Sequence, residues 1–297
     1  MSSARFSRRT SAFSITVLLT ALLFAGCEKK ETIQKMIQPS FKYEAVDLSG
    51  APDEATLKLP DGVKLALIKV EAGSFTMSAR DGDNFDNEVL HRAALTRDFY
   101  LGQTEVTQDQ WKAVMGRNPS QFKGKSTLPV ERVSWNDAMD FCEKLNSAGA
   151  APGGWMFSLP TETQWEYAAR GGQKSIGYNG IGYKYSGSDS LETAAWYHEN
   201  SDGKTHPVGE MKANELGLYD MTGNVCEWCL DDWAFRSDGL IEEFTRGNDR
   251  HRQPRSMRGG CWDYFYVTCR TAYRDKCDPV IRSSTFGFRL ALVPASY

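Results

Sequence analysis

Cysteine is the residue of this sequence from which metal or redox chemistry would most readily start. Cys226 and Cys229 have the C-x-x-C spacing of a redox pair or of half a zinc site. A zinc site needs a second such pair or a pair of nearby histidines, and the sequence contains neither. The G-x-S-x-G, P-loop and H-E-x-x-H motifs are absent as well. No nucleophile or zinc motif therefore accounts for the function.

A run of aromatic residues near the C-terminus points to binding instead. Residues 258–274 read RGGCWDYFYVTCRTAYR, and Tyr264, Phe265 and Tyr266 are consecutive. Because side chains of a strand alternate between its faces, at least one ring must face solvent or a pocket. Adjacent exposed rings usually mark a recognition surface, and tyrosine combines a large contact area with a polar group. The residues predicted to bind a ligand are Cys261, Trp262, Asp263, Tyr264, Phe265, Tyr266, Val267, Thr268, Thr271 and Cys277, with Asp249, His251 and Asp275 as rim contacts.

Three helices are predicted by one local pattern. Each of the segments 107–110, 134–137 and 161–164 begins with Ser or Thr and ends with Gln or Asp, the pattern of a capping box. The alternating segments 64–70 and 286–293 predict strands. Long connections rich in glycine, serine and asparagine separate these elements. The predicted fold class is α+β, with few short helices, short strands and much irregular chain.

Length and composition indicate one folded domain, which we place at residues 61–297. The chain has 297 residues, 41% of them hydrophobic, which is enough for one large core. No internal repeat suggests a second unit. The formal net charge of -3 does not favour nucleic acid as a partner. We expect a monomer whose partner is a protein or another cell-surface ligand.

The N-terminus resembles a bacterial lipoprotein signal peptide over residues 1–26. Arginines precede the apolar run 12–25, which is too short for a comfortable membrane span. Small residues then lead to Cys27, the residue that would be acylated. The alternative is an ordinary secretory cleavage site with an incidental cysteine. Residues 27–60 are predicted to be an acylated tether, which makes the chain an exported lipoprotein of the outer membrane or cell surface.

A set of motifs in a fixed order indicates the family. They are GSFTM (73–77), QTEVT (103–107), LPVERVSWNDAMDFC (128–142), LPTETQWEYAARGG (159–172), HPVGE and NELGLYDMTGNVCEW within 206–228, RGGCW (258–262) and FGFRL (286–290). Together they resemble the formylglycine-generating-enzyme type of domain, a variant of the C-type lectin fold, over roughly residues 63–294. A fold of this kind hosts unrelated activities, so function must be argued from the site.

The positions at which the chain departs from the family's motifs argue against the family's oxidase chemistry. The sulfatase-modifying enzyme holds copper with two cysteines after its RGG motif; Cys269 matches the second, and Tyr264 stands in place of the first. A phenol does not replace a thiolate at a Cu(I) site. A further branch of the family binds iron through histidines of an additional helical bundle, and this chain has only four histidines. His206 matches a structural motif. We therefore predict no enzyme activity and no catalytic cofactor.

The resemblance also suggests a structural calcium ion at the turn 220–227. Its ligands would be the carboxylates of Asp220 and Glu227 and the carbonyls of Gly223 and Val225. The alternative is a turn without metal, in which these acids bond to the backbone. The tripeptide at 135–137 also occurs at lectin calcium sites, but its place at the start of a capped helix explains it sufficiently.

Residue types in the C-terminal segment suggest diversification. Codons for Asp, Tyr, Phe, Val, Thr, Cys and Ser are reached from an asparagine codon by replacing adenines. Residues 263–268 all belong to this set, as do Cys261, Thr271, Asp275, Cys277, Asp278 and 283–285. The pattern resembles the variable proteins of diversity-generating retroelements, whose ligand-binding site is rewritten. We expect a variable site at about residues 245–285; the alternative is a fixed-function family member, either a cysteine oxidase or a non-catalytic protein.

Overall fold

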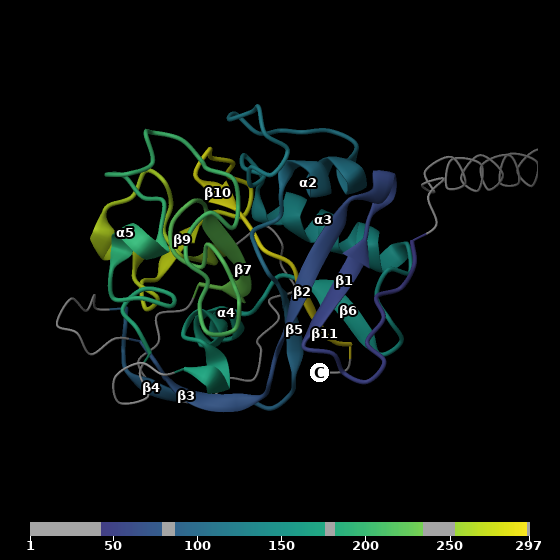
Figure 1. The fold of residues 1–297 in the computed structure, drawn as a ribbon, viewed down its shortest axis with the longest axis horizontal. Coiled ribbons are helices and arrows are strands. Elements are labelled where there is room, and N and C mark those ends of the chain that lie inside the picture. Colours follow the sequence, from purple (N-terminus) through teal and green to yellow (C-terminus); the bar gives the residue numbers. More distant parts are fainter. Residues whose placement is uncertain (1–42, 79–86, 176–181, 234–252, 296–297) are drawn as a thin grey trace, which may run out of the picture. The chain divides into compact units, whose positions relative to one another are not determined.

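The structure is a computed structural model that describes residues 43–78, 87–175, 182–233 and 253–295 (Figure 1). The predicted signal peptide, Cys27, and the rim residues Asp249 and His251 lie outside the described residues. Residues from Tyr43 onward form one compact unit. Within the described ranges, no helix has the length and apolar character needed to cross a membrane.

The central sheet has five antiparallel strands in the order β1-β2-β5-β11-β6. The strands are β1 (Glu54–Lys58), β2 (Lys64–Val70), β5 (Phe99–Gly102), β6 (Trp155–Ser158) and β11 (Ala291–Pro294). Side chains of β2 alternate between two apolar layers, with Leu65 and Leu67 in one and Ile68 and Val70 in the other. The sheet is therefore buried on both faces.

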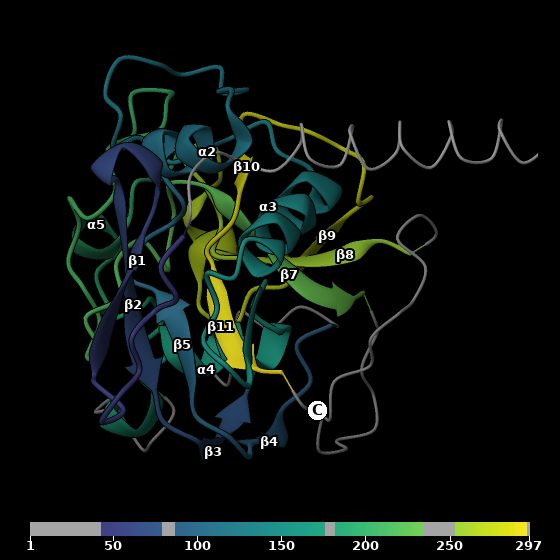
Figure 2. The same cartoon turned by 90° about the vertical axis from the view of Figure 1, so that its right-hand side faces the viewer.

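The three predicted helices are confirmed, each with both bonds of its capping box. They are α2 (Gln108–Met115), α3 (Trp135–Ser147) and α4 (Glu162–Ala169), and a single turn, α5 (Leu191–Ala194), follows. Helices α2 and α3 lie side by side (Figures 1 and 2) and bury Trp111 and Phe141 in the first layer. Helix α4 places Trp165 in the second layer, so helices cover both faces of the sheet.

A second sheet of four strands has the order β10-β7-β8-β9. Its strands are β7 (Cys226–Asp232), β8 (Arg255–Arg258), β9 (Asp275–Cys277) and β10 (Phe286–Gly287). Strands β3 (Gly73–Met77) and β4 (His91–Leu95) form a separate antiparallel pair. Short 3-10 turns complete the described elements: η1 (Pro60–Gly62), η2 (Gly172–Lys174) and η4 (Tyr266–Cys269).

The strand predicted over 286–293 is in fact two strands in different sheets. β10 pairs in parallel with β7, and β11 lies between β5 and β6. Between them, Arg289 turns its side chain to Glu227, so the chain crosses from one sheet to the other at this buried ion pair. A continuous alternation of apolar residues does not show such a crossing, because both sheets have the same period.

The tether predicted over 27–60 is wrong for residues 43–60, the part that the structure describes. β1 pairs with β2 along its whole length, and Tyr43, Val46, Leu57 and Leu59 are buried in the core. The apolar residues of this segment stand singly among polar ones, a pattern that is equally typical of a linker. The folded unit therefore includes residues 43–60 as well as the predicted 61–297.

Candidate ligand-binding surface

Arg258, the first residue of the RGG motif, fixes the chain that follows the predicted binding segment. Its side chain is buried and donates hydrogen bonds to the carbonyls of Thr271 and Tyr273, both at 2.9 Å. It forms ion pairs with Glu162, at 3.0 Å, and with Glu166, both on α4. A buried cation is stable only when it is paired in this way. The pairing therefore ties residues 271–273 to the helix.

Two more buried arginines hold the same stretch. Arg270 donates two hydrogen bonds to Glu88, at 2.9 and 2.7 Å, and Arg274 donates two to Glu162, at 2.6 and 2.7 Å. Such bidentate pairs fix orientation as well as position. Burial raises the pKa of Glu88, and this effect exceeds the lowering by Arg270. Residues 270–274 are thus held rigidly. We call the buried arginine–glutamate pairs and the chain that they fix the frame.

The loop between the RGG motif and η4 is fixed by hydrogen bonds to three other segments. The Trp262 amide donates to Asn224 O at 2.9 Å, and its indole donates to Ser284 O at 2.9 Å. The His198 amide donates to Tyr264 O at 3.1 Å. Gly260 has φ of 72°, and a Cβ there would lie 2.8 Å from the Cys269 sulfur, so the turn requires glycine. These hydrogen bonds and the turn at Gly260 hold the loop in one conformation before any ligand binds.

The most exposed aromatic side chains of the described residues lie at the end of this loop and at the start of η4. Phe265 is 57% exposed and Tyr266 is 49% exposed. The ring of His198 lies 4.6 Å from the ring of Phe265, and its Nδ1 lies 3.7 Å from Asp263 Oδ1. We call Asp263, Phe265 and Tyr266, together with His198, the aromatic surface. Sequence patterns did not include His198, because it lies about 65 residues earlier in the chain.

Tyr264 belongs to the frame and not to the aromatic surface. Its ring is half-buried and packs against two apolar clusters. Its hydroxyl donates to Asp275 Oδ2 at 3.1 Å. The negative charge that neighbouring Cys226 would carry, together with burial, raises the pKa of this phenol. Of the three consecutive rings, one therefore faces inward and two face outward.

Several other predicted contacts are also buried. Cys261 and Thr271 have 0% and 2% of their surface exposed, so the prediction that they contact a ligand is wrong for this structure. Cys261 lies in the first apolar layer, and the Thr271 hydroxyl faces the carbonyls of Tyr183 and Lys184. The remaining predicted residues are partly accessible: Trp262, Val267, Thr268, Asp275 and Cys277.

Cys269, which matches one copper-binding cysteine of the enzyme, is a core residue. It has no exposed surface and packs with Tyr185, Leu191 and Tyr197. Burial raises the pKa of its thiol, so the thiolate that copper requires is disfavoured. Among the described residues, no group of three His, Cys, Asp or Glu side chains has the geometry of a metal site.

Of the calcium ligands predicted at the turn 220–227, Glu227 is already engaged by protein groups. Glu227 accepts two hydrogen bonds from Arg289, each at 2.7 Å, and a third from the Trp165 indole at 2.8 Å. Its carboxylate is therefore already neutralised by a guanidinium, whose charge would repel a divalent cation. Asp220 accepts from the Gly209 amide at 2.7 Å, and burial raises its pKa to about 6. The contacts of Glu227 favour the alternative, a turn without metal, whereas Asp220 Oδ1 is a buried acceptor without a partner among the described residues.

The other chemistry-bearing residues have structural partners. Cys226 and Cys229 pack in different apolar layers, as expected for strand residues three apart, and both are free thiols. His206 stacks on Trp196 at 3.7 Å and bonds to Ser201 O at 2.8 Å, which confirms its structural role. Asp137 caps α3, as predicted for the tripeptide 135–137.

The fold and this frame of buried arginine pairs define a domain of the formylglycine-generating-enzyme type, with its C-type lectin-like architecture. The family described as "Sulfatase-modifying factor enzyme 1-like domain" matches residues 58–293. The chain belongs to this family. The resemblance and the fold class predicted from the motifs are therefore confirmed.

Similar proteins include enzymes and proteins of other kinds. The chain is 34% identical over 258 residues to Chaperone protein LppX of Paenibacillus barcinonensis, a match that covers 71% of this chain and 84% of that protein. It is 29% identical over 238 residues to the formylglycine-generating enzyme of Mus musculus, covering 74% of this chain but only 60% of the enzyme. Among solved structures, Treponema denticola variable protein 1 has a TM-score of 0.71 and 31% identity, covering 82% of this chain and 100% of that one.

Proposed function

We propose that the protein is a surface-displayed, ligand-binding lipoprotein whose C-terminal segment, about residues 245–285, forms a sequence-variable binding site. The observation that carries this proposal is the aromatic surface. Phe265 and Tyr266 are each about half exposed on a loop whose backbone is held from three sides. Exposed rings on a fixed backbone lose little conformational entropy when they bind, which is the physical basis of antibody-like recognition.

The distribution of residue types around the frame supports variation at this site. Asp263, Phe265, Tyr266 and Asp278 belong to the set reached by replacing adenines, and all are exposed. Arg258 and Arg289, which hold the frame, are buried. These four positions of the set face solvent, where a substitution would leave the fold intact, whereas Cys261 and Thr271 belong to the same set and are buried. The similarity to a variable protein of known structure points the same way.

The ligand is proposed to be a protein or another cell-surface molecule bound without turnover. The relative named as a chaperone agrees with a binding role. Burial of Cys269 and the place of Tyr264 in the frame argue against copper-dependent oxidation of a cysteine. The alternative is a family member with a fixed function, as the enzymes among its relatives illustrate.

Deep sequencing of codons 245–290 from a clonal culture tests the proposal. We expect diversity confined to adenine-derived codons, concentrated at positions 263–268, with the codons of 258–260 and 286–290 unchanged. Invariant codons throughout would contradict a variable site and favour the fixed-function alternative.

The lipid anchor requires a separate test, because Cys27 lies outside the described residues. The full gene is expressed in a bacterial host with radiolabelled palmitate. We expect label in the wild-type chain and none in Cys27→Ala. Equal labelling of both chains, or of neither, would contradict acylation at Cys27 and favour ordinary secretion.

A further inference from the structure

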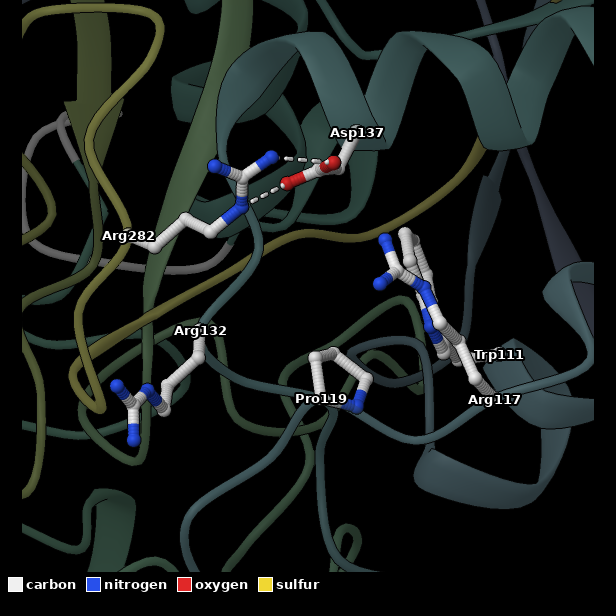
Figure 3. Close-up of a pocket in the computed structure, with 6 residues that line it drawn as sticks. All are labelled: Trp111, Arg117, Pro119, Arg132, Asp137 and Arg282. Carbon is white, nitrogen blue, oxygen red and sulfur yellow. Dashed lines mark hydrogen bonds and ion pairs between the residues drawn. The ribbon is translucent and has the colours of Figure 1, made fainter.

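A pocket of about 430 Å³ lies beside the start of α3, and its lining is strongly basic (Figure 3). Three arginines and one aspartate give it a net charge of 3 − 1 = +2, whereas the whole chain carries -3. The volume is within the range of small-molecule sites, roughly 300–1,000 Å³. We call it the arginine pocket. Its lining residues are Trp111, Arg117, Pro119, Arg132, Asp137 and Arg282.

Each arginine reaches the pocket from a different segment. Arg117 follows the glycine that ends α2, and Arg132 lies on the connection to α3. Arg282 comes from the C-terminal segment and donates to both oxygens of Asp137, at 2.7 and 2.8 Å. Figure 3 shows this pair on one side of the pocket, and Arg132 and Arg117 to either side of Pro119. Residues far apart in the sequence thus converge on one volume.

The backbone at Arg132 is held in an uncommon conformation. Its φ is 60°, in the left-handed region that non-glycine residues seldom adopt, and its amide donates to Ser283 O at 2.9 Å. Such strain persists only where the surrounding structure enforces it, and it concentrates at functional sites. Within the described part of the chain, neither Arg132 nor Arg117 forms a salt bridge. Two exposed guanidinium groups at the pocket are therefore available to a ligand.

The wall of the pocket also contains a buried donor without an acceptor. Trp111 is 1% exposed and stacks on Phe141, with its ring planes 8° apart. Its indole Nε1 has no hydrogen-bond partner among the residues that the structure describes. A buried N–H group without a partner is destabilising. Because Nε1 is covered, an oxygen-rich ligand in the pocket would supply an acceptor only after the neighbouring side chains move.

We propose that the arginine pocket binds a phosphate monoester group. The planar guanidinium fork matches the oxygens of phosphate, and two net positive charges match a phosphate dianion. The group can come from a small soluble phosphate ester or from the head group of a phosphorylated lipid. The site rests on residues 111–137 and on Arg282, which lies within the proposed variable segment 245–285, but it shares no residue with the aromatic surface.

Isothermal titration calorimetry of the full chain with sn-glycerol 3-phosphate tests the proposal. Each of Arg117→Gln and Arg132→Asn is expected to weaken binding roughly tenfold or more, because each removes a charge-assisted hydrogen-bond donor. Asparagine is chosen at 132 because it tolerates the left-handed conformation better than other residues. Arg92→Gln, which removes an exposed arginine on β4 bonded to Ser74, is the matched control and should bind normally.

Two comparisons separate the sources and the chemistry of the ligand. Flotation with vesicles containing phosphatidic acid detects a lipid-borne phosphate, and binding to these vesicles alone would identify the lipid as the source. Equal affinity for succinate would show a general anion site and overturn the phosphate assignment. Absence of saturable binding to both glycerol phosphate and the vesicles would overturn the site itself, as would equal loss of affinity in Arg92→Gln.

A spectroscopic readout tests the role of Trp111 directly. The chain has eight tryptophans, each with one indole N–H signal, and Trp111→Phe identifies the signal of Trp111. Saturation with glycerol 3-phosphate should shift that signal downfield and leave the Trp165 signal unchanged, because Trp165 already donates to Glu227 at 2.8 Å. If Trp111→Phe does not fold, Arg117→Gln should abolish the ligand-induced shift. Binding without any shift at an indole would contradict a bond from Trp111.

Discussion

Tyr264 and Phe265 are neighbours in sequence but have opposite structural roles. The Tyr264 hydroxyl donates to Asp275 Oδ2 at 3.1 Å, whereas the Phe265 ring is 57% exposed. The hydrogen bond ties the loop to β9 and leaves the next ring on the surface. A frame residue and a surface residue are thus separated by a single peptide bond.

Substitution of these two rings should affect stability very differently. Phe265→Ala removes an exposed side chain and should change the free energy of unfolding by less than about 0.5 kcal/mol. Tyr264→Ala leaves a hole between two apolar clusters and should lower it by about 2–3 kcal/mol. Tyr264→Phe, the matched control, loses only the bond to Asp275 and should lower it by about 1 kcal/mol. Urea denaturation of the full chain measures all three.

Equal losses in Phe265→Ala and Tyr264→Ala would contradict this division. They would place both rings in the core, and the aromatic surface would lose one of its two large contacts. The proposal of a binding site would then rest on Tyr266 alone.

Copper affinity should be absent in the wild-type chain and gained by one substitution. Cys269 is buried with a raised thiol pKa, and Tyr264 occupies the position of the first cysteine. Competition with a Cu(I) chelator should show no binding by wild type or by Cys269→Ser. Tyr264→Cys, which supplies the missing thiol, should bind more tightly than either. Tight binding by wild type, or oxygen uptake with a cysteine-containing peptide, would contradict a non-enzymatic role.

Local sequence signals predicted the helices well because their physical cause is local. The capping boxes at 107–110, 134–137 and 161–164 each involve residues three apart, and all three are present in the structure. The strand over 64–70 was also correct, because its apolar residues are dense. In contrast, β1 was missed because only Ala55 and Leu57 of its five residues are buried.

Contacts between distant residues limited the prediction of the site. Arg270 pairs with Glu88, which lies 182 residues away, and no local pattern links the two. Cys261 and Thr271 belong to the adenine-derived set, yet they are buried, because residue type alone does not give the direction of a side chain on an irregular loop. The arginine pocket was missed for the same reason, since its residues come from three segments.

Calcium should have no effect on stability if Arg289 neutralises Glu227 as the structure indicates. The thermal midpoint of the full chain should stay within about 1 °C in EDTA and in millimolar calcium. A ligand present at about one hundred times its Kd stabilises the folded state by roughly 2.7 kcal/mol, an effect that would be clearly visible. A calcium-dependent rise of several degrees, lost in Asp220→Asn, would restore the metal site that the family resemblance suggested.

The pH dependence of stability should carry the signature of a buried acid next to the arginine pocket. Burial raises the pKa of Glu131 to about 7 from its ordinary value of 4.5, and this effect exceeds the lowering by backbone amides. Glu131 Oε1 accepts from the Phe122 amide at 2.8 Å, and Oε2 is a buried acceptor without a partner among the described residues. Because the folded-state pKa is raised, the contribution of this group is fully present below pH 4.5 and is lost as pH rises through 7.

Glu131→Gln tests this directly, because glutamine keeps an oxygen for the Phe122 amide and does not ionise. We expect the variant to be more stable than wild type at pH 8, by up to about 3 kcal/mol, and to match it near pH 4. Urea denaturation across this pH range measures the difference, and the exposed Glu54→Gln should follow wild type throughout. A constant difference at all pH values would instead mean that Glu131 acts through its shape and hydrogen bonds. A stability gain confined to high pH ties the loss of wild-type stability to ionisation of this one carboxyl group.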